Sequence, residues 1–348
     1  MMTASLFPEI PIIQAPMAGG ITTPALVAAV AQAGAVGSFG FAYSTADRIA
    51  SDMAEARAMT NGAINANFFV FEPITAPNID DIVQATKALC DLPLSLDVTA
   101  YDVLRSPFVP SLADQLEGLI YNAPDYLTFH FGIPPQDVMA KARAAGIKVG
   151  ITATCLTEAE AIAKAGADFV VAQGYEAGGH RGTFTAIPDN DEELSSISLT
   201  KELVDWGHLP VVTAGGIMSG ADITQARAIG AAAVQMGTAF LCADEAGTSP
   251  SYRDAILSWD NLPTVMTPHF SGRYARAIEN KYISLMREQK FLSFPLQNTL
   301  TTPLRQKAAN QGDANYQSLW AGTGFHQTLK APAAEILRKL VDDINKGS

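Results

Sequence analysis

The sequence of 348 residues predicts an α/β fold, a closed (β/α)8 barrel with a smaller helical domain inserted after the eighth strand. The first observation behind this prediction is that short apolar runs alternate eight times with segments of helical pattern. The second is that glycine recurs between a helix and the next strand, as at Gly34, Gly146, Gly166 and Gly230, where it suits the end of a helix. The third is that the alternation stops after Phe240. An open doubly wound sheet is the alternative, but eight units favour closure.

The predicted strands are short runs rich in Val, Ile and Phe, a composition that suits parallel strands buried on both faces. The clearest is the run Phe169-Val-Val-Ala-Gln173, which is apolar up to its last residue. In chain order the strands are expected at residues 10–14, 35–38, 63–70, 126–130, 148–152, 169–173, 210–214 and 233–236.

A helix is expected after each of the first seven strands. The first begins at Thr23 and Pro24, because threonine caps a helix and proline suits its first position, and it ends at Gly34. The connection between the third and fourth strands is longer than one crossover needs and holds two helical patterns. The helices after the first are expected at 45–59, 80–90, 112–121, 135–145, 157–165, 199–206 and 221–229.

Three domains are predicted from this division. Residues 1–243 form the barrel domain, and residues 244–320 form a helical lid over its carboxyl-terminal face, with a helix at 274–289. Residues 321–348 contain apolar residues at helical spacing and are expected to pack back on the barrel as its last helix.

The composition excludes several classes of partner. A net charge of −12 disfavours nucleic acid and anionic membrane surfaces. No apolar run approaches the length of a membrane span, and no secretory signal pattern opens the sequence. Cys90, Cys155 and Cys242 are widely spaced, so we expect mostly buried, reduced thiols, no metal site and a cytoplasmic protein. The sequence leaves the oligomeric state open, either a monomer or a homodimer.

One loop combines glycines with a titratable group at the end of a buried strand. Residues 172–182 read Ala-Gln-Gly-Tyr-Glu-Ala-Gly-Gly-His-Arg-Gly and follow the sixth predicted strand. Such dense glycine indicates a sharp turn or a close approach of the backbone to a ligand. His180 is therefore the candidate functional residue, and a tight connection with a solvated histidine is the alternative. Arg181 is expected to point outward and pair with an acid.

Other polar residues fall at the ends of predicted strands, where such barrels carry their active sites. Asn67, Gln173 and Gln235 lie within or at the end of apolar strands, so each needs a partner, either a ligand or backbone. His130, at the end of the fourth strand, is a candidate ligand-binding residue, with a satisfied core histidine as the alternative.

Glycine follows the last two predicted strands as well. Gly215-Gly216 and Gly237-Thr238 stand where barrels of this class commonly hold a phosphate on backbone N–H groups. A tight turn at Gly215 is the competing interpretation. The sequence contains no dinucleotide-binding glycine fingerprint and no phosphate loop of the ATPase type, so neither a Rossmann nor an ATP site is indicated.

Taken together, these blocks resemble the FMN-dependent nitronate monooxygenases, formerly called 2-nitropropane dioxygenases, of the class I type. The resemblance covers essentially the whole chain. The matching blocks are Gln14-Ala-Pro-Met-Ala-Gly-Gly20 with Thr23-Pro24, Thr128-Phe-His-Phe-Gly132, Ala172 to Gly182, Ala214-Gly-Gly-Ile217, Gln235-Met-Gly-Thr-Ala-Phe240, Phe270-Ser-Gly-Arg-Tyr-Ala-Arg276 with Asn280, and Ser318-Leu-Trp-Ala-Gly322. One departure is Tyr274, where the family pattern has proline; it bears on the local shape of the lid.

The resemblance implies a TIM barrel that binds FMN, with His180 as the catalytic residue that also contacts the substrate. It further implies a set of cofactor-binding residues along the strand ends. These are Pro16, Met17, Ala18, Asn67, Gln173, Gly178, Gly179, Gly215, Gly216, Gln235, Met236, Gly237 and Thr238. We add His130 as a candidate substrate-binding residue.

The activity implied by the resemblance is oxidation of alkyl nitronates, such as propionate 3-nitronate, with O₂. An NAD(P)H-dependent FMN reductase of the same superfamily, acting on quinones or enoyl thioesters, is one alternative. A non-catalytic barrel that binds a phosphorylated ligand is another, although the many polar residues at strand ends exceed what a bare phosphate site needs. The expected partners are a small nitronate and O₂, without nucleic acid or membrane.

Overall fold

A computed structural model describes the chain apart from residues 1–5, 75, 95–107, 188–189, 260 and 347–348. Eight parallel strands form the predicted barrel, in the order β1-β9-β8-β6-β5-β4-β3-β2. A bridge between Ile13 and Val36 joins β1 to β2 and closes the ring. The strands are β1 (Ile12–Gln14), β2 (Gly37–Gly40), β3 (Ile64–Phe69), β4 (Tyr126–His130), β5 (Lys148–Ala153), β6 (Phe169–Gln173), β8 (Val211–Ala214) and β9 (Ala233–Met236). The prediction of a (β/α)8 barrel is confirmed.

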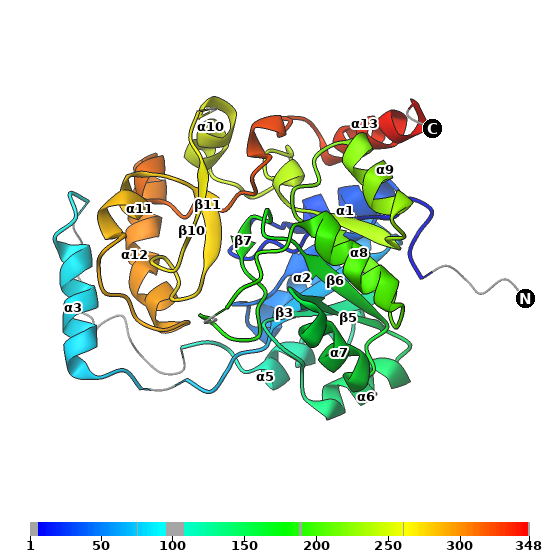
Figure 1. Ribbon diagram of the computed structural model, residues 1–348, viewed down its shortest axis with the longest axis horizontal. Helices are drawn as coiled ribbons and strands as arrows, with labels where there is room; N and C mark the ends of the chain where they lie inside the picture. Colours follow the sequence, from blue (N-terminus) through cyan, green and yellow to red (C-terminus); the bar gives the residue numbers. More distant parts are fainter. Residues whose placement is uncertain (1–5, 75, 95–107, 188–189, 260, 347–348) are drawn as a thin grey trace, which may run out of the picture.

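Helices cover the outside of the barrel (Figure 1). Their apolar residues pack on the strands, as Ile49 and Met53 of α2 do in the main core cluster. Gly166 ends α7 in the left-handed conformation, with φ of 82°, which confirms the role expected of the recurring glycines. The helices are α1 (Pro24–Gln32), α2 (Ala46–Met59), α5 (Leu112–Glu117), α6 (Gln136–Ala144), α7 (Leu156–Ala165), α8 (Ser196–Trp206), α9 (Gly220–Ala228) and α13 (Ala333–Lys346).

The C-terminal helix α13 packs against α1 and α9. Ile336, Leu337 and Leu340 share a core cluster with Leu26 of α1 and Ile223 of α9. Burial of this apolar stripe explains why a helix so far along the chain returns to the barrel.

A second group of elements lies beside the barrel and is called the cap layer here (Figure 1). Its sheet is antiparallel, with the order β10-β11-β7, and joins β10 (Thr264–Thr267) and β11 (Ala275–Ile278) to β7 (Gly179–His180). The short strand β7 belongs to the glycine-rich loop after β6, so this loop links the barrel to the cap layer. The helices of the cap layer are α3 (Ile79–Cys90), α10 (Pro250–Ser258), α11 (Lys281–Met286) and α12 (Leu296–Asn310).

The cap layer corrects one expectation and adds a contact that the sequence did not predict. The helix predicted at 274–289 is wrong in its first half, because Ala275–Ile278 pairs with β10 and β7 as a buried strand and only Lys281–Met286 is helical. Long-range pairing overrides the local helical pattern here. The helix expected at 80–90 is confirmed as α3, and it packs within the cap layer, since Ala85 and Leu89 share a cluster with Leu300 and Leu304. The domain boundaries at residues 243 and 320 stay a prediction.

Some findings bear on what the protein can bind. Within the described residues, no helix is long and apolar enough to cross a membrane. No cluster of His, Cys, Asp or Glu that could hold a metal ion occurs in the same part of the chain. The expectation of mostly buried thiols is wrong for Cys90, which is exposed; Cys155 is half-buried and only Cys242 is buried.

Candidate active site

A cavity of about 380 Å³ lies at the carboxyl ends of the barrel strands, between the barrel loops and the cap layer. Tyr252, Arg305 and Trp320 contribute the cap side of its wall. Every residue that the sequence singles out for binding or catalysis lines this cavity, namely Pro16, Met17, Ala18, Asn67, His130, Gln173, Gly178, Gly179, His180, Gly215, Gly216, Gln235, Met236, Gly237 and Thr238. The structure therefore brings the candidate residues together, while their individual roles stay predictions.

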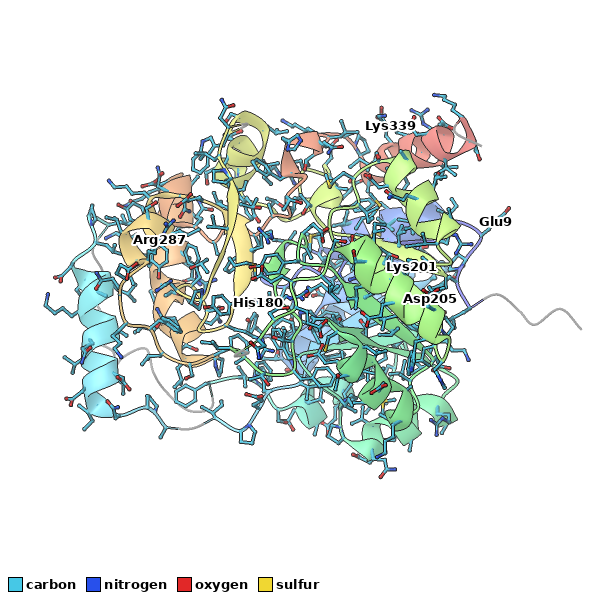
Figure 2. All side chains as sticks on the ribbon, viewed as in Figure 1. Glu9, His180, Lys201, Asp205, Arg287 and Lys339 are labelled. Atoms are coloured by element: carbon cyan, nitrogen blue, oxygen red, sulfur yellow. The ribbon has the colours of Figure 1, made fainter. Side chains whose placement is uncertain are left out.

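His180 lies where the barrel meets the cap layer (Figure 2). Its backbone pairs with Ala275 of β11, and its Nε2 lies 2.9 Å from the Ser271 hydroxyl. That hydroxyl donates to the carbonyl oxygen of Arg273 at 3.0 Å, so it accepts from His180. This assignment places the proton of the imidazole on Nε2. Nδ1 then carries the lone pair, and it bonds to no described residue.

Two barrel residues hold the main chain of His180. Its carbonyl oxygen accepts from Gln173 Nε2 at 2.9 Å and lies 3.2 Å from His130 Nε2. Gln173 Oε1 in turn accepts from the backbone N–H of Gly182 at 2.7 Å. Gln173 and His130 thus position the loop, which agrees with the backbone partner considered for Gln173 and with the alternative of a satisfied histidine for His130. Their predicted contacts with cofactor and substrate stay predictions.

Aromatic rings surround the His180 side chain. The ring centroids of Phe69, Phe131, Phe294 and Trp320 lie 5.9, 5.7, 5.7 and 5.5 Å from that of the imidazole. Burial among these rings, aided by His130, Arg273 and Arg305, lowers the pKa of His180 to about 3. Burial likewise lowers the pKa of His130 to about 3. His180 is therefore a neutral imidazole near pH 7, whereas the sequence left a cationic form open.

Acid should destabilise the protein through these two histidines. In the unfolded chain they titrate near 6.5, while their folded pKa values are about 3, so between these values the unfolded state binds more protons. The free energy of unfolding should therefore fall as the pH decreases below about 6.5. Its slope against pH should correspond to the uptake of up to about one proton per histidine on unfolding. Urea unfolding between about pH 5 and 7 measures this slope. His130→Gln, which keeps a donor for the His180 carbonyl, should reduce it; an unchanged slope would contradict the assignment.

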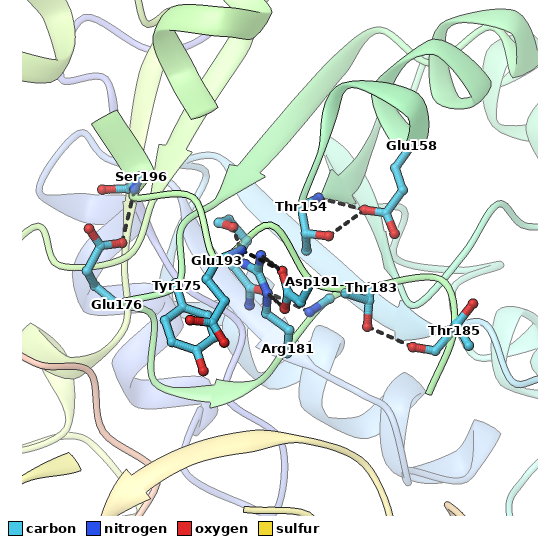
Figure 3. Close-up of polar contacts among 12 residues, drawn as sticks. Thr154, Glu158, Tyr175, Glu176, Arg181, Thr183, Thr185, Asp191, Glu193 and Ser196 are labelled. Carbon is cyan, nitrogen blue, oxygen red and sulfur yellow. Dashed lines mark hydrogen bonds and ion pairs between the residues drawn. The ribbon is translucent and has the colours of Figure 1, made fainter. Parts of the chain in front are cut away.

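Arg181 is buried and does not point outward as expected, although it does pair with an acid. Its Nε and Nη2 bind both carboxylate oxygens of Asp191 at 2.7 Å, and its Nη1 donates to the Gln173 carbonyl oxygen at 2.6 Å (Figure 3). This bidentate pair ties the segment before α8 to the end of β6. Arg181 is therefore a structural residue behind the site. Neither motif nor spacing identified Asp191 as the acid.

Arg273 fixes the cap side of the same loop. Its guanidinium stacks on the Phe131 ring at 3.8 Å from the centroid and donates to the carbonyl oxygens of Thr183 and Thr185. The backbone N–H of Arg181 donates to the Tyr274 carbonyl oxygen at 2.9 Å. A proline at position 274 would offer the same carbonyl, so the departure from the family pattern does not disturb this bond.

The turns after β8 and β9 form what we call the glycine cradle, made of Gly215, Gly216 and Gly237 with Thr238. Gly215 and Gly216 have φ values of 108° and 71°, which favour glycine strongly. At Gly237 the backbone is ordinary, and an added Cβ would meet only Ala15 Cβ at 3.3 Å and Met17 Sδ at 3.8 Å. The cradle thus exposes backbone to the cavity, as a phosphate site requires.

Three further residues carry buried polar atoms that have no hydrogen-bond partner in the structure and line the cavity. They are the hydroxyls of Tyr43 and Thr248 and the Nε of Arg305. An unpaired buried polar group costs about 1–3 kcal/mol, so such a cluster indicates a ligand. These residues come from three distant segments, which is why no sequence pattern identified them.

Known proteins match this chain over nearly its whole length. A family profile described as "Nitronate monooxygenase" matches residues 2–343. A "Probable nitronate monooxygenase" of Staphylococcus aureus (strain Newman) is 35% identical over 354 residues, which cover 99% of this chain and 97% of the relative. The solved nitroalkane oxidase from Streptomyces ansochromogenes is 34% identical, with a TM-score of 0.87 over 98% of this chain and 97% of that one. The solved FabK from Thermotoga maritima is 25% identical, with a TM-score of 0.74 over 98% and 95%.

Proposed function

Because the chain belongs to the nitronate monooxygenase family, we propose that it oxidises alkyl nitronates with O₂ in an FMN-dependent reaction. The products are a carbonyl compound and nitrite or nitrate, and propionate 3-nitronate is a candidate substrate. The observation that carries the proposal is the neutral His180, with Nδ1 unbonded, in an aromatic chamber that shares one cavity with the glycine cradle.

FMN fits this cavity on the features of the chain itself. A volume of about 380 Å³ is within the range of small-ligand sites. The glycine cradle would hold the phosphate, and Pro16, Met17 and Ala18 with Asn67 would border the ring. Bound FMN would supply the electron transfer between substrate and O₂, which no side chain in the cavity can provide.

His180 has two possible roles, which its hydrogen bond to Ser271 separates. With the proton on Nε2, as the Ser271 hydrogen bonds assign it, Nδ1 can accept a proton from the carbon of a neutral nitroalkane. To bind a nitronate oxygen, Nδ1 must carry the proton instead, and then the Ser271 hydroxyl must turn to donate to Nε2. Ser271 thus positions the ring in either form.

The visible spectrum of the purified protein under anaerobic conditions tests the proposal. Adding a nitronate such as ethyl nitronate should change the flavin absorption, because the substrate itself supplies electrons. Bleaching by NADH or NADPH with no response to a nitronate would contradict the proposal and support the reductase alternative. A colourless protein that takes up no FMN would support a non-catalytic barrel.

A further inference from the structure

We propose that Arg305 and Tyr43 form an anion-binding subsite beside His180, which holds a planar two-oxygen anion of the substrate. That anion is the nitronate group itself or a carboxylate carried on the same molecule, and both have the shape that a guanidinium recognises. The inference rests on the proposed function and names the residues that supply the charge for an anionic substrate.

Arg305 has hydrogen-bonding capacity that the protein does not use. Its Nη2 donates to the Asn298 carbonyl oxygen, Asn298 Oδ1 and Thr302 Oγ1 at 2.9, 2.8 and 2.9 Å. No carboxylate within the described residues forms an ion pair with it, and its buried Nε has no partner. A guanidinium buried without a counter-ion is costly, so an anion that enters the cavity would complete this site.

Tyr43 offers a second donor to the same space. It follows β2, packs edge-on against Phe69 with centroids 5.8 Å apart, and its buried hydroxyl has no partner. Burial raises the pKa of Tyr43 and the nearby Arg305 lowers it only in part, so the phenol stays protonated. A protonated phenol beside an unpaired guanidinium gives two donors for one anion.

The subsite belongs to the substrate region and not to the glycine cradle. The backbone N–H of Asn298 donates to the Ser271 carbonyl oxygen at 3.1 Å, and Ser271 contacts His180. Arg305 is also among the charges that lower the pKa of His180. The glycine cradle, by contrast, follows β8 and β9 in the barrel.

An anionic substrate in this cavity needs a positively charged partner. The chain has a net charge of −12, and both histidines of the cavity are neutral. Arg305 is the only lysine or arginine among the described residues that line the cavity. An anionic substrate in this chamber therefore has Arg305 as its counter-charge.

Kinetics of the FMN-loaded enzyme test the proposal with two substrates, ethyl nitronate and propionate 3-nitronate. Arg305→Gln should reduce kcat/KM by about 10²-fold, mainly through KM, and Arg305→Lys should restore part of it. An equal loss for both substrates places the nitronate group at Arg305, and a loss confined to propionate 3-nitronate places the carboxylate there. Unchanged kcat/KM for both substrates overturns the proposal.

Tyr43→Phe separates binding from folding. Because the hydroxyl has no partner in the protein, its removal should leave Tm unchanged or higher while raising KM about 3–10-fold.

Arg287→Gln is the matched control for Arg305→Gln. It also removes one positive charge from the cap layer, but Arg287 is exposed, pairs with Glu279 at 2.6 Å and lies away from His180 (Figure 2). An Arg287→Gln loss equal to that of Arg305→Gln would also overturn the proposal.

Binding of unreactive anions keeps this test independent of turnover. Propionate and nitrate should raise the Tm of the wild-type holoenzyme, but not that of Arg305→Gln. A wild type that oxidises no nitronate but is stabilised through Arg305 disproves the proposed function and leaves the subsite standing. If the wild type oxidises nitronates but the anions raise the Tm of the wild type and of Arg305→Gln equally, the subsite alone is disproved.

Discussion

His180→Asn should lower kcat/KM for a preformed nitronate by about 10–10²-fold, the range expected when a hydrogen bond to an anionic substrate is lost. The Nε2 of His180 lies 2.9 Å from the Ser271 hydroxyl, and the backbone carbonyl oxygen of His180 accepts from Gln173 Nε2 at 2.9 Å. The ring is therefore fixed before substrate enters. Asparagine can still accept or donate one bond but cannot place a ring nitrogen in the aromatic chamber. Steady-state kinetics on the variant, with FMN content measured from the visible spectrum, give the result.

Two variants control for indirect effects at His180. His130→Gln keeps a donor for the His180 carbonyl and should cost less than about 10-fold. Ser271→Ala removes the group that sets the tautomer and should alter the ratio of nitronate to nitroalkane turnover while the ring remains. If His180→Asn retains full kcat/KM on a preformed nitronate, the residue does not bind the substrate.

The barrel could be predicted because each of its elements carries a local signal. The strand at 169–173 is apolar up to its last residue, and the structure places β6 at Phe169–Gln173. Thr23 accepts from the backbone N–H of Leu26 as the predicted helix cap. Closure itself depends on Ile13 and Val36, whose pairing no local pattern encodes, so it followed only from the number of units.

The cap layer could be predicted less well because its contacts are long-range. β11 is held by β10 on one edge and on the other by β7, a strand of two residues within the loop of His180. So short a strand leaves no periodicity to detect. The same pairing places His180 against the cap layer, and therefore the sequence identified the histidine but not the surface that positions it.

The residues of the candidate site likewise fall into those that the sequence reveals and those that only the fold reveals. Glycine turns and a histidine at strand ends are visible in the sequence because their chemistry is unusual where they stand. Ser271 lies in a block of the family resemblance without an assigned role, and Tyr43 and Arg305 are ordinary in their own segments. All three become informative only when folding buries a polar atom without a partner or completes a hydrogen-bond chain. For Arg181 the sequence predicts an acidic partner, but neither its burial nor the identity of Asp191 follows from a local pattern.

Gly237→Val should abolish FMN retention, so that the purified variant is colourless and the Kd for FMN rises by at least about 10²-fold. The reason is steric, because the valine methyl groups would occupy the glycine cradle where backbone must approach a phosphate. The fold should survive. The backbone at Gly237 has φ of −103°, which any residue adopts, and a Cβ there meets only Ala15 Cβ and Met17 Sδ.

A graded series makes this prediction specific to the cradle. Gly237→Ala adds a single methyl group and should weaken FMN binding less than valine does, because Ala15 Cβ at 3.3 Å must shift by only a few tenths of an ångström. Gly132→Ala is the control: it follows another barrel strand, an added Cβ meets Val70 at ordinary distances of 3.5 and 3.6 Å, and Gly132 is not part of the cavity wall. Fluorescence titration with FMN and thermal unfolding of the apoproteins measure both effects. Since the proposed chemistry depends on FMN, a Gly237→Val protein that keeps a full complement of FMN would show that the cofactor does not rest on this turn.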